Sequence, residues 1–191
     1  MATTLNQTVL KALAARLKSA NGMVANYYQG ESSERTPVHT LYGGAQLFKR
    51  TTAQKIGQLA SRHFEAHCSQ PAQLVEVFGI QDPGMATAII QRTQEKLSRE
   101  AVEDFRIDFE DGFGVRPEAE EDETAIFAAK ELAAAWQEGV MSPFSGIRIK
   151  SLGEETKLRS LRTLDIFLTQ LVESTGRNIP DGFVVTLPKI T

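Results

Sequence analysis

Four short runs rich in β-branched and aromatic residues limit the folds open to this chain, because long amphipathic segments follow each of the first three. The runs predict strands at 38–44, 102–109, 144–150 and 182–190. Apolar residues at helical spacing predict helices at 50–67, 118–139 and 154–175. Such alternation is typical of parallel strands joined by crossover helices, so the sequence predicts an α/β fold.

The rest of the chain adds helices outside this alternation. Residues 5–20 have apolar positions at helical spacing, and the polar, turn-rich stretch 21–37 predicts a loop. Between the first two strands, a short helical piece from Pro71 and a longer one to Glu100 form an insertion at about 71–99. We therefore expect an N-terminal helix and loop at 1–36 and an α/β domain at 37–191.

Apolar and charged side chains alternate along the second strand. One face carries Phe105, Ile107 and Phe109, and the other carries Arg106, Asp108 and Glu110. The third strand alternates in the same way. An open doubly wound sheet would be apolar on both faces, whereas a barrel turns one face to its helices and the other to its interior. The pattern thus favours the first four strands of a TIM-type barrel.

Charged residues also gather where the strands end. These residues are Asp108, Glu110, Arg148, Lys150 and Lys189. In a barrel they would meet at the carboxyl-terminal mouth, where TIM-barrel active sites lie. Acids together with bases suit a carboxylate substrate bound to a metal ion. The alternative interpretation is an internal network of salt bridges that fills the end of the barrel.

Three segments resemble a known family. "RIDFEDGFG" resembles the D-L-E-D segment of the citrate lyase β-subunit and malyl-CoA lyase family, within the HpcH/HpaI aldolase superfamily. "GIRIK" is similar to that family's third-strand R-V-N or R-I-N segment, and "VVTLPKI" resembles its fourth-strand L-P-K segment. Their order and spacing agree from about residue 37 to the last residue. "PVHTLYGG" and "RTLDIFL" resemble an aldolase/citrate-lyase-like branch of the family.

The resemblance implies a phosphoenolpyruvate/pyruvate-type TIM barrel and a Mg²⁺-dependent carbon–carbon lyase. Its substrate would be a 2-oxo acid or an acyl-CoA-derived compound, cleaved through an enolate held on Mg²⁺. Catalytic roles would fall to Arg148, Glu110 and Asp111, with Arg148 on the substrate's carboxylate or keto oxygen. Asp108 and Glu110 would lie at the metal, in contact with its water ligands.

The resemblance also implies substrate contacts from Arg148, Lys150, Lys189, Gly43 and Gly44. The glycines could cradle a phosphate or simply form a tight turn. Two departures are visible: Lys150 stands where the family has Asn, and the first strand ends in Tyr42-Gly43-Gly44 instead of V-P-G. The family's direct metal ligands, a Glu and an Asp on the fifth and sixth strands, are expected beyond Thr191.

Other candidate sites are weaker. His63 and His67 are four residues apart on an expected helix, but H-x-E-x-H differs from the zinc motif H-E-x-x-H, which favours surface or packing histidines. The one cysteine, Cys68, excludes a disulfide framework. A net charge of −3 gives no basic surface for nucleic acid. Because no stretch approaches the ~20 apolar residues of a membrane span, we expect a cytoplasmic protein.

Two rival functions stay open. One is a non-catalytic half-barrel that serves binding or assembly, and the other is an open α/β binding domain. We expect lyase activity only from a complete barrel. Four strands leave open edges at the first and the last, so we also expect a homo-oligomer.

Overall fold

The structure is a computed structural model, and it describes residues 6–28, 30 and 33–189. The chain forms two compact units, Met1–Thr36 and Pro37–Thr191. The only described helix of the first unit is α1 (Gln7–Tyr27). Asn6 begins it, because its side-chain oxygen accepts a hydrogen bond from the Val9 N–H at 2.9 Å.

Helix α1 is longer than the sequence analysis expected. It continues through 21–27, where we expected a loop, so that part of the loop prediction is wrong. Asn21 and Gly22 suggested a turn, but Val24 continues the apolar spacing set by Leu17, and one glycine inside a helix is tolerated. Leu5, the first residue of the expected helix, lies outside the described residues, as do 29 and 31–32 of the expected loop.

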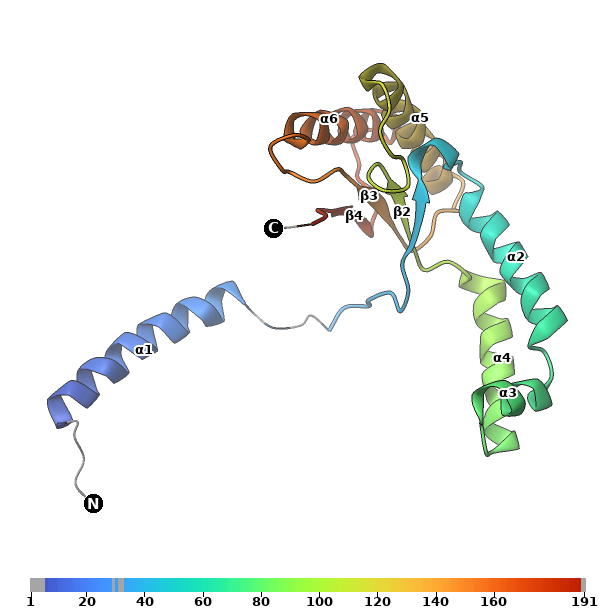
Figure 1. The fold of residues 1–191 in the computed structure, drawn as a ribbon, viewed down its shortest axis with the longest axis horizontal. Coiled ribbons are helices and arrows are strands. Elements are labelled where there is room, and N and C mark those ends of the chain that lie inside the picture. The colour runs from blue at the N-terminus through green and yellow to red at the C-terminus, as the bar shows by residue number, and fades with distance from the viewer. Residues whose placement is uncertain (1–5, 29, 31–32, 190–191) are drawn as a thin grey trace. The chain divides into compact units, whose positions relative to one another are not determined.

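The second unit holds the sheet (Figure 1). Its elements in order are β1 (Leu41–Gly44), the 3-10 turn η1 (Ala45–Leu47), α2 (Thr52–His67), α3 (Pro71–Phe78), α4 (Pro83–Glu100), β2 (Asp104–Asp108), α5 (Glu118–Gln137), β3 (Phe144–Arg148), α6 (Lys157–Ser174) and β4 (Phe183–Thr186). All strand pairs are parallel, and the strands lie in the order β1-β2-β3-β4. The predicted α/β class is confirmed.

The strands are shorter than expected at both ends of the sheet. β1 begins at Leu41 and not at Val38. Before Leu41 the chain bonds to side chains of the neighbouring segment instead of forming backbone hydrogen bonds of a strand pair: the Val38 N–H donates to Glu103 Oε2 at 2.5 Å. The Thr40 hydroxyl donates to Asp104 at 2.8 Å. β4 ends at Thr186, two residues before Pro188, which has no N–H to donate. Residue 190, the last of the expected strand, lies outside the described residues.

One face of the sheet carries the main core. Phe105, Ile107 and Ile147 are buried on this face. They pack against α5 and α6, which lie side by side over the sheet in Figure 1; the residues contributed by these helices include Ala125, Ala128, Ala129, Leu132, Phe167 and Leu171. The alanines of α5 let this helix approach the strands closely. The alternation places Tyr42, Arg106, Asp108 and Arg148 on the other face.

Helices α3 and α4 form the expected insertion between α2 and β2. They share a small core of Leu74, Ala86 and Ile90, against which Phe64 of α2 packs. None of the described helices has the length and apolarity that crossing a bilayer requires.

Candidate functional site

The site is built around an ion pair between neighbouring strands. Asp108, the last residue of β2, lies beside Arg148, the last residue of β3. Arg148 Nε donates to Asp108 Oδ1 at 2.8 Å, and Arg148 Nη2 donates to Asp108 Oδ2 at 2.6 Å. This two-point contact fixes the plane of the guanidinium group, because arginine presents its donors in a rigid fork.

Asp108 also holds the loop that follows β2. Its Oδ1 accepts from the Glu110 N–H at 2.9 Å, and its Oδ2 accepts from the Gly112 N–H at 2.7 Å. With the two bonds from Arg148, four donors surround a carboxylate that is 2% exposed. A carboxylate has about four acceptor positions. Asp108 therefore positions the arginine and the loop, and in this arrangement it has no free position for a metal ion.

The electrostatics of this pair favour the charged forms. Burial, the largest influence on Asp108, opposes its ionisation, but the Arg148 side chain and the two backbone N–H groups together outweigh burial and lower the pKa of Asp108. The hydrogen bond with Asp108 raises the pKa of Arg148 above its ordinary value, more than burial lowers it. Both groups are ionised at neutral pH.

Two more acids and a lysine surround the arginine. Glu110 Oε2 lies 3.4 Å from Arg148 Nη1, and Glu110 Oε1 lies 3.1 Å from Lys189 Nζ. Asp111 Oδ1 also lies 3.1 Å from Lys189 Nζ, and its Oδ2 lies 3.6 Å from Arg148 Nη2. The hydrogen bonds with Asp111 and then Glu110 raise the pKa of Lys189. The structure thus brings Asp108, Glu110, Arg148 and Lys189 together, as expected, and adds Asp111 to them.

Tyr42 completes this cluster from β1. The Arg148 guanidinium carbon lies 4.6 Å from the centre of the Tyr42 ring, within the range of a cation–π contact. Sequence reasoning noted Tyr42 only as a departure from the family pattern. The signal that could have found it is the alternation of β1, which places Tyr42 on the charged face of the sheet.

Gly43 and Gly44 make close packing contacts. A Cβ atom on Gly43 would lie 2.7 Å from the Phe105 ring, and one on Gly44 would lie 2.3 Å from the Gly112 carbonyl oxygen. The Gln46 amide donates to the same carbonyl at 3.1 Å. Close contacts with Phe105 and Gly112 leave no room for a side chain at either glycine. Tight packing therefore explains both glycines, and these contacts do not indicate a phosphate cradle.

Lys150 does not join the cluster around Arg148. Its Nζ donates to the Phe109 carbonyl at 2.6 Å and to Glu121 Oε2 of α5 at 2.9 Å. Lys150 lies two residues after the last residue of β3, so the alternation that placed it beside Arg148 no longer applies. The fully buried Glu121 also accepts from the Thr163 hydroxyl at 2.6 Å.

A second ion pair lies on the same face, closer to the start of β2. Arg106 Nη2 lies 2.9 Å from Asp104 Oδ2. Asp104 is fully buried and Arg106 is nearly so. Arg106 Nε and Nη1 and Asp104 Oδ1 have no hydrogen-bond partner among the described residues. Sequence reasoning placed Arg106 on this face but gave it no function.

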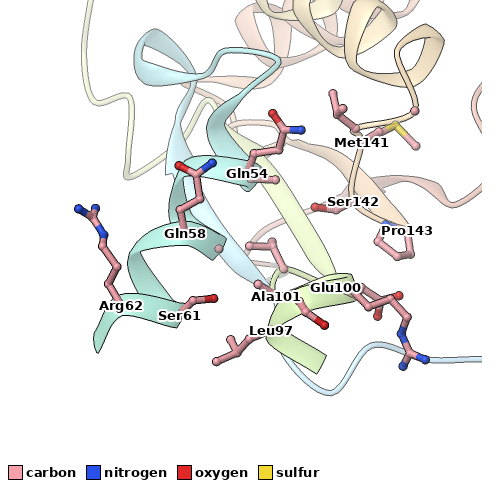
Figure 2. A pocket seen from close by; sticks show the side chains of 17 residues that line it. Gln54, Gln58, Ser61, Arg62, Leu97, Glu100, Ala101, Met141, Ser142 and Pro143 are labelled. Atoms are coloured by element: carbon pink, nitrogen blue, oxygen red, sulfur yellow. The ribbon is translucent and has the colours of Figure 1, made fainter. Parts of the chain in front are cut away.

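A groove lies at the opposite ends of the strands. Its volume is about 860 Å³, and it is bounded by α2, the end of α4 and the segment before β3. Figure 2 shows Gln54 and Gln58 of α2 on one side of it and Met141, Ser142 and Pro143 on the other. Because 101–102 and 139–143 precede β2 and β3, the groove is separate from the charged cluster.

The described residues do not by themselves form a metal centre. No group of three or more His, Cys, Asp or Glu side chains is suitably placed within them. The acids around Arg148 are paired with cations. The His63 and His67 rings stack with their centres 6.1 Å apart. Cys68 is a free thiol.

Comparison with known families shows that the charged residues around Arg148 lie inside a domain that defines a protein family. Residues 17–191 match the model of a domain of unknown function, DUF6986. The chain belongs to the DUF6986 family. The DUF6986 match begins within α1 and takes in the whole sheet, so every residue of the charged cluster lies inside the family domain. Neither the curated proteins nor the solved structures gave a match.

Proposed function

We propose that this chain is part of a Mg²⁺-dependent carbon–carbon lyase of the HpcH/HpaI aldolase, citrate-lyase-like type. Its substrate is a 2-oxo acid or an acyl-CoA-derived compound. The observation that carries the proposal is the position of Arg148 and its charged neighbours at the carboxyl ends of parallel strands. Active sites of TIM-barrel enzymes lie at this end of the strands.

The sheet supports the barrel part of the proposal. Its strands follow one another in chain order, whereas a doubly wound sheet reverses direction at a switch point. The main core lies on one face, against α5 and α6, and the other face bears charges. Both features fit the first four strands of a TIM barrel, with the charged face turned to its interior.

In this proposal Arg148 binds the substrate's carboxylate. Asp108 occupies the Nε and Nη2 edge of the guanidinium group and holds its orientation. Nη1 lies 3.4 Å from Glu110 without a hydrogen bond to it, so its donors are available to an anion. Tyr42 flanks one face of the group and limits the directions from which a ligand enters.

Lys189 is the second cation of the proposed substrate site. Its side chain is 58% exposed, and it is protonated at neutral pH, since the hydrogen bonds with Asp111 and Glu110 raise its pKa above the already high value of an ordinary lysine. Lys189 would contact the outer end of an anionic substrate, while Arg148 lies deeper. A substrate with two negative groups would use both cations.

The acids present do not fit a direct Mg²⁺ site. Asp108 has its acceptor positions filled, and Glu110 and Asp111 face Arg148 and Lys189. The proposal therefore assigns the direct Mg²⁺ ligands to other parts of the complete protein, and we derive no step through the metal from these residues.

A non-catalytic role in binding or assembly is the alternative. It is favoured by the mutual pairing of the charged residues: three acids surround Arg148, and two of them also contact Lys189. A network satisfied in this way can close one end of a sheet without binding a substrate.

Calorimetric titration with oxalate, an analogue of the enolate of pyruvate, tests the proposal. Oxalate in the presence of Mg²⁺ should bind to the complete protein. Arg148→Lys should weaken this binding by about tenfold or more, because lysine keeps the charge but loses both the two-point contact with Asp108 and the Nη1 donors. Arg162→Lys is the matched control, since Arg162 makes a similar pair with Asp122 on the helices.

The control variant should bind oxalate like the unchanged protein. Absence of oxalate binding, or equal binding by the Arg148→Lys variant, would reject the substrate site and favour the role in assembly.

A further inference from the structure

Helix α1 has an apolar stripe with alternating spacings of three and four residues. The stripe consists of Leu10, Leu13, Leu17, Ala20, Val24 and Tyr27. Such spacing repeats every seven residues, and it is the pattern by which two helices pack along each other. Nothing within the first unit covers the stripe, and Leu17 is 61% exposed and Val24 55% exposed.

Helix α1 lacks the buried apolar contacts that would stabilise it in isolation. None of its residues is buried, and helices of this length are marginal in water unless an apolar face packs against something. A surface with seven-residue periodicity is matched best by another helix with the same periodicity. A second copy of α1 provides one.

The charges of α1 decide the direction of such a pair. Lys11, Arg16 and Lys18 are its only charged residues; Lys11 and Arg16 lie in its N-terminal half, and Lys18 lies one residue past its midpoint. A parallel pair would place these cations at the same level as those of the second helix. In an antiparallel pair, Lys11 and Arg16 of each helix lie beside the C-terminal half of the other, at the level of Asn26 and Asn21, which reduces their repulsion.

We propose that α1 packs antiparallel against α1 of a second copy of the chain. The register that pairs all stripe positions places Leu10 against Tyr27 of the partner subunit, Leu13 against Val24 of the partner subunit, and Leu17 against Ala20 of the partner subunit. In each contact, a residue of the series Leu10, Leu17, Val24 meets a residue of the series Leu13, Ala20, Tyr27. The central contact, between Leu17 and Ala20, joins a large side chain to a small one. The pairing is independent of the proposed lyase function.

Disulfide cross-linking of the full chain tests this register. In a Cys68→Ser background, Leu13→Cys is combined with Val24→Cys. The two positions are eleven residues apart in one helix, or about 16 Å, too far for a bridge within one chain. Mild oxidation should therefore give a covalent dimer, detected by non-reducing electrophoresis and by mass.

The matched control combines Ala15→Cys with Gly22→Cys. These positions face each other at the same level in the proposed register, but on the side of the helix away from the stripe. They should cross-link at least about tenfold more slowly, because the pairing holds them apart. Circular dichroism of each variant confirms that helix content is retained.

Three results would overturn the proposal. Rapid dimer formation by Leu13→Cys alone would show a parallel pair, since antiparallel helices keep these two positions apart. Equal rates in the stripe and control variants would show random collisions. Binding of the chain to anionic phospholipid vesicles, without a specific cross-link, would show that the stripe and its basic residues serve a membrane surface.

Discussion

At the carboxyl end of β2, the Asp108 carboxylate holds two parts of the candidate site at once. It orients the Arg148 guanidinium, and it accepts two N–H groups from the loop that carries Glu110. Alternation along β2 and β3 was sufficient to predict that Asp108 and Arg148 share a face. The loop contacts could not be predicted, because they depend on how residues 109–112 turn after the strand ends.

The low pKa of Asp108 makes it a source of pH-dependent stability. Its folded-state pKa is lower than the value of about 3.9 for an unfolded chain. The folded protein thus binds fewer protons, so this contribution is complete above the unfolded pKa and is lost as pH falls through the folded pKa. Asp108→Asn should lower the free energy of unfolding at neutral pH by about 2–3 kcal/mol. It should also reduce the loss of stability in acid.

Urea denaturation at a series of pH values measures both effects. The same dependence on acid pH in the Asp108→Asn variant and the unchanged protein would contradict the role given to Asp108.

Under the proposed lyase function, Arg148→Lys should reduce turnover in the complete protein while leaving the fold intact. The lysine keeps a cation beside Asp108 but loses the fork that would bind a carboxylate. A decrease in kcat/KM of about 10²-fold is expected, as for the loss of one preorganised donor. Cleavage of a 2-oxo acid substrate provides the measurement. An unchanged rate with an accepted substrate would remove Arg148 from the proposed site.

At the scale of elements, the contact between α5 and α6 depends on a buried acid. Glu121 of α5 lies 2.9 Å from Lys150 Nζ and accepts a hydrogen bond from Thr163 of α6. The helices themselves were predictable from apolar spacing and from the alanine-rich sequence of 118–137. The position of the Lys150 side chain was not predictable, because the alternation of side chains along a strand no longer applies once β3 has ended at Arg148.

Glu121→Ala should destabilise the protein by about 3–5 kcal/mol, the range expected when one partner of a buried ion pair is removed. Glu118→Ala, in the same first turn of α5 but exposed, should change stability by less than about 0.5 kcal/mol. Urea denaturation of both variants gives the comparison.

Replacing both charges, by Glu121→Gln with Lys150→Met, should recover part of the lost stability, because no charge then stays buried alone. If Glu121→Ala has an effect no larger than that of Glu118→Ala, the buried pair does not stabilise the α5–α6 contact.

For the whole molecule, the order of strands and helices along the chain was a better guide to the fold than the predicted strand lengths. Alternating strands and helices predicted parallel strands, and the structure adds that β1 and β4 lie at the two edges of the described sheet. The start of β1 was misjudged, since Val38 and Thr40 bond to the side chains of Glu103 and Asp104. Propensity alone does not reveal such long-range contacts.

A fragment consisting of residues 37–191 should fold without α1, but copies of it should associate. Their core is built from their own strands and helices, whereas the edges of β1 and β4 have unpaired backbone groups. Sedimentation velocity should show a mass that increases with concentration even when α1 is absent. A stable monomer at every concentration would indicate that the four-stranded sheet is self-contained.

The contact between Gly44 and Gly112 joins two positions that are far apart in the chain. A Cβ on Gly112 would lie 3.1 Å from the Gly44 nitrogen, and a Cβ on Gly44 would meet the Gly112 carbonyl oxygen. A side chain gained at either position would push the loop away from β1 and disturb the bonds that Asp108 makes to it. During divergence of the family, these two glycines should therefore be retained or replaced together, as a covarying pair.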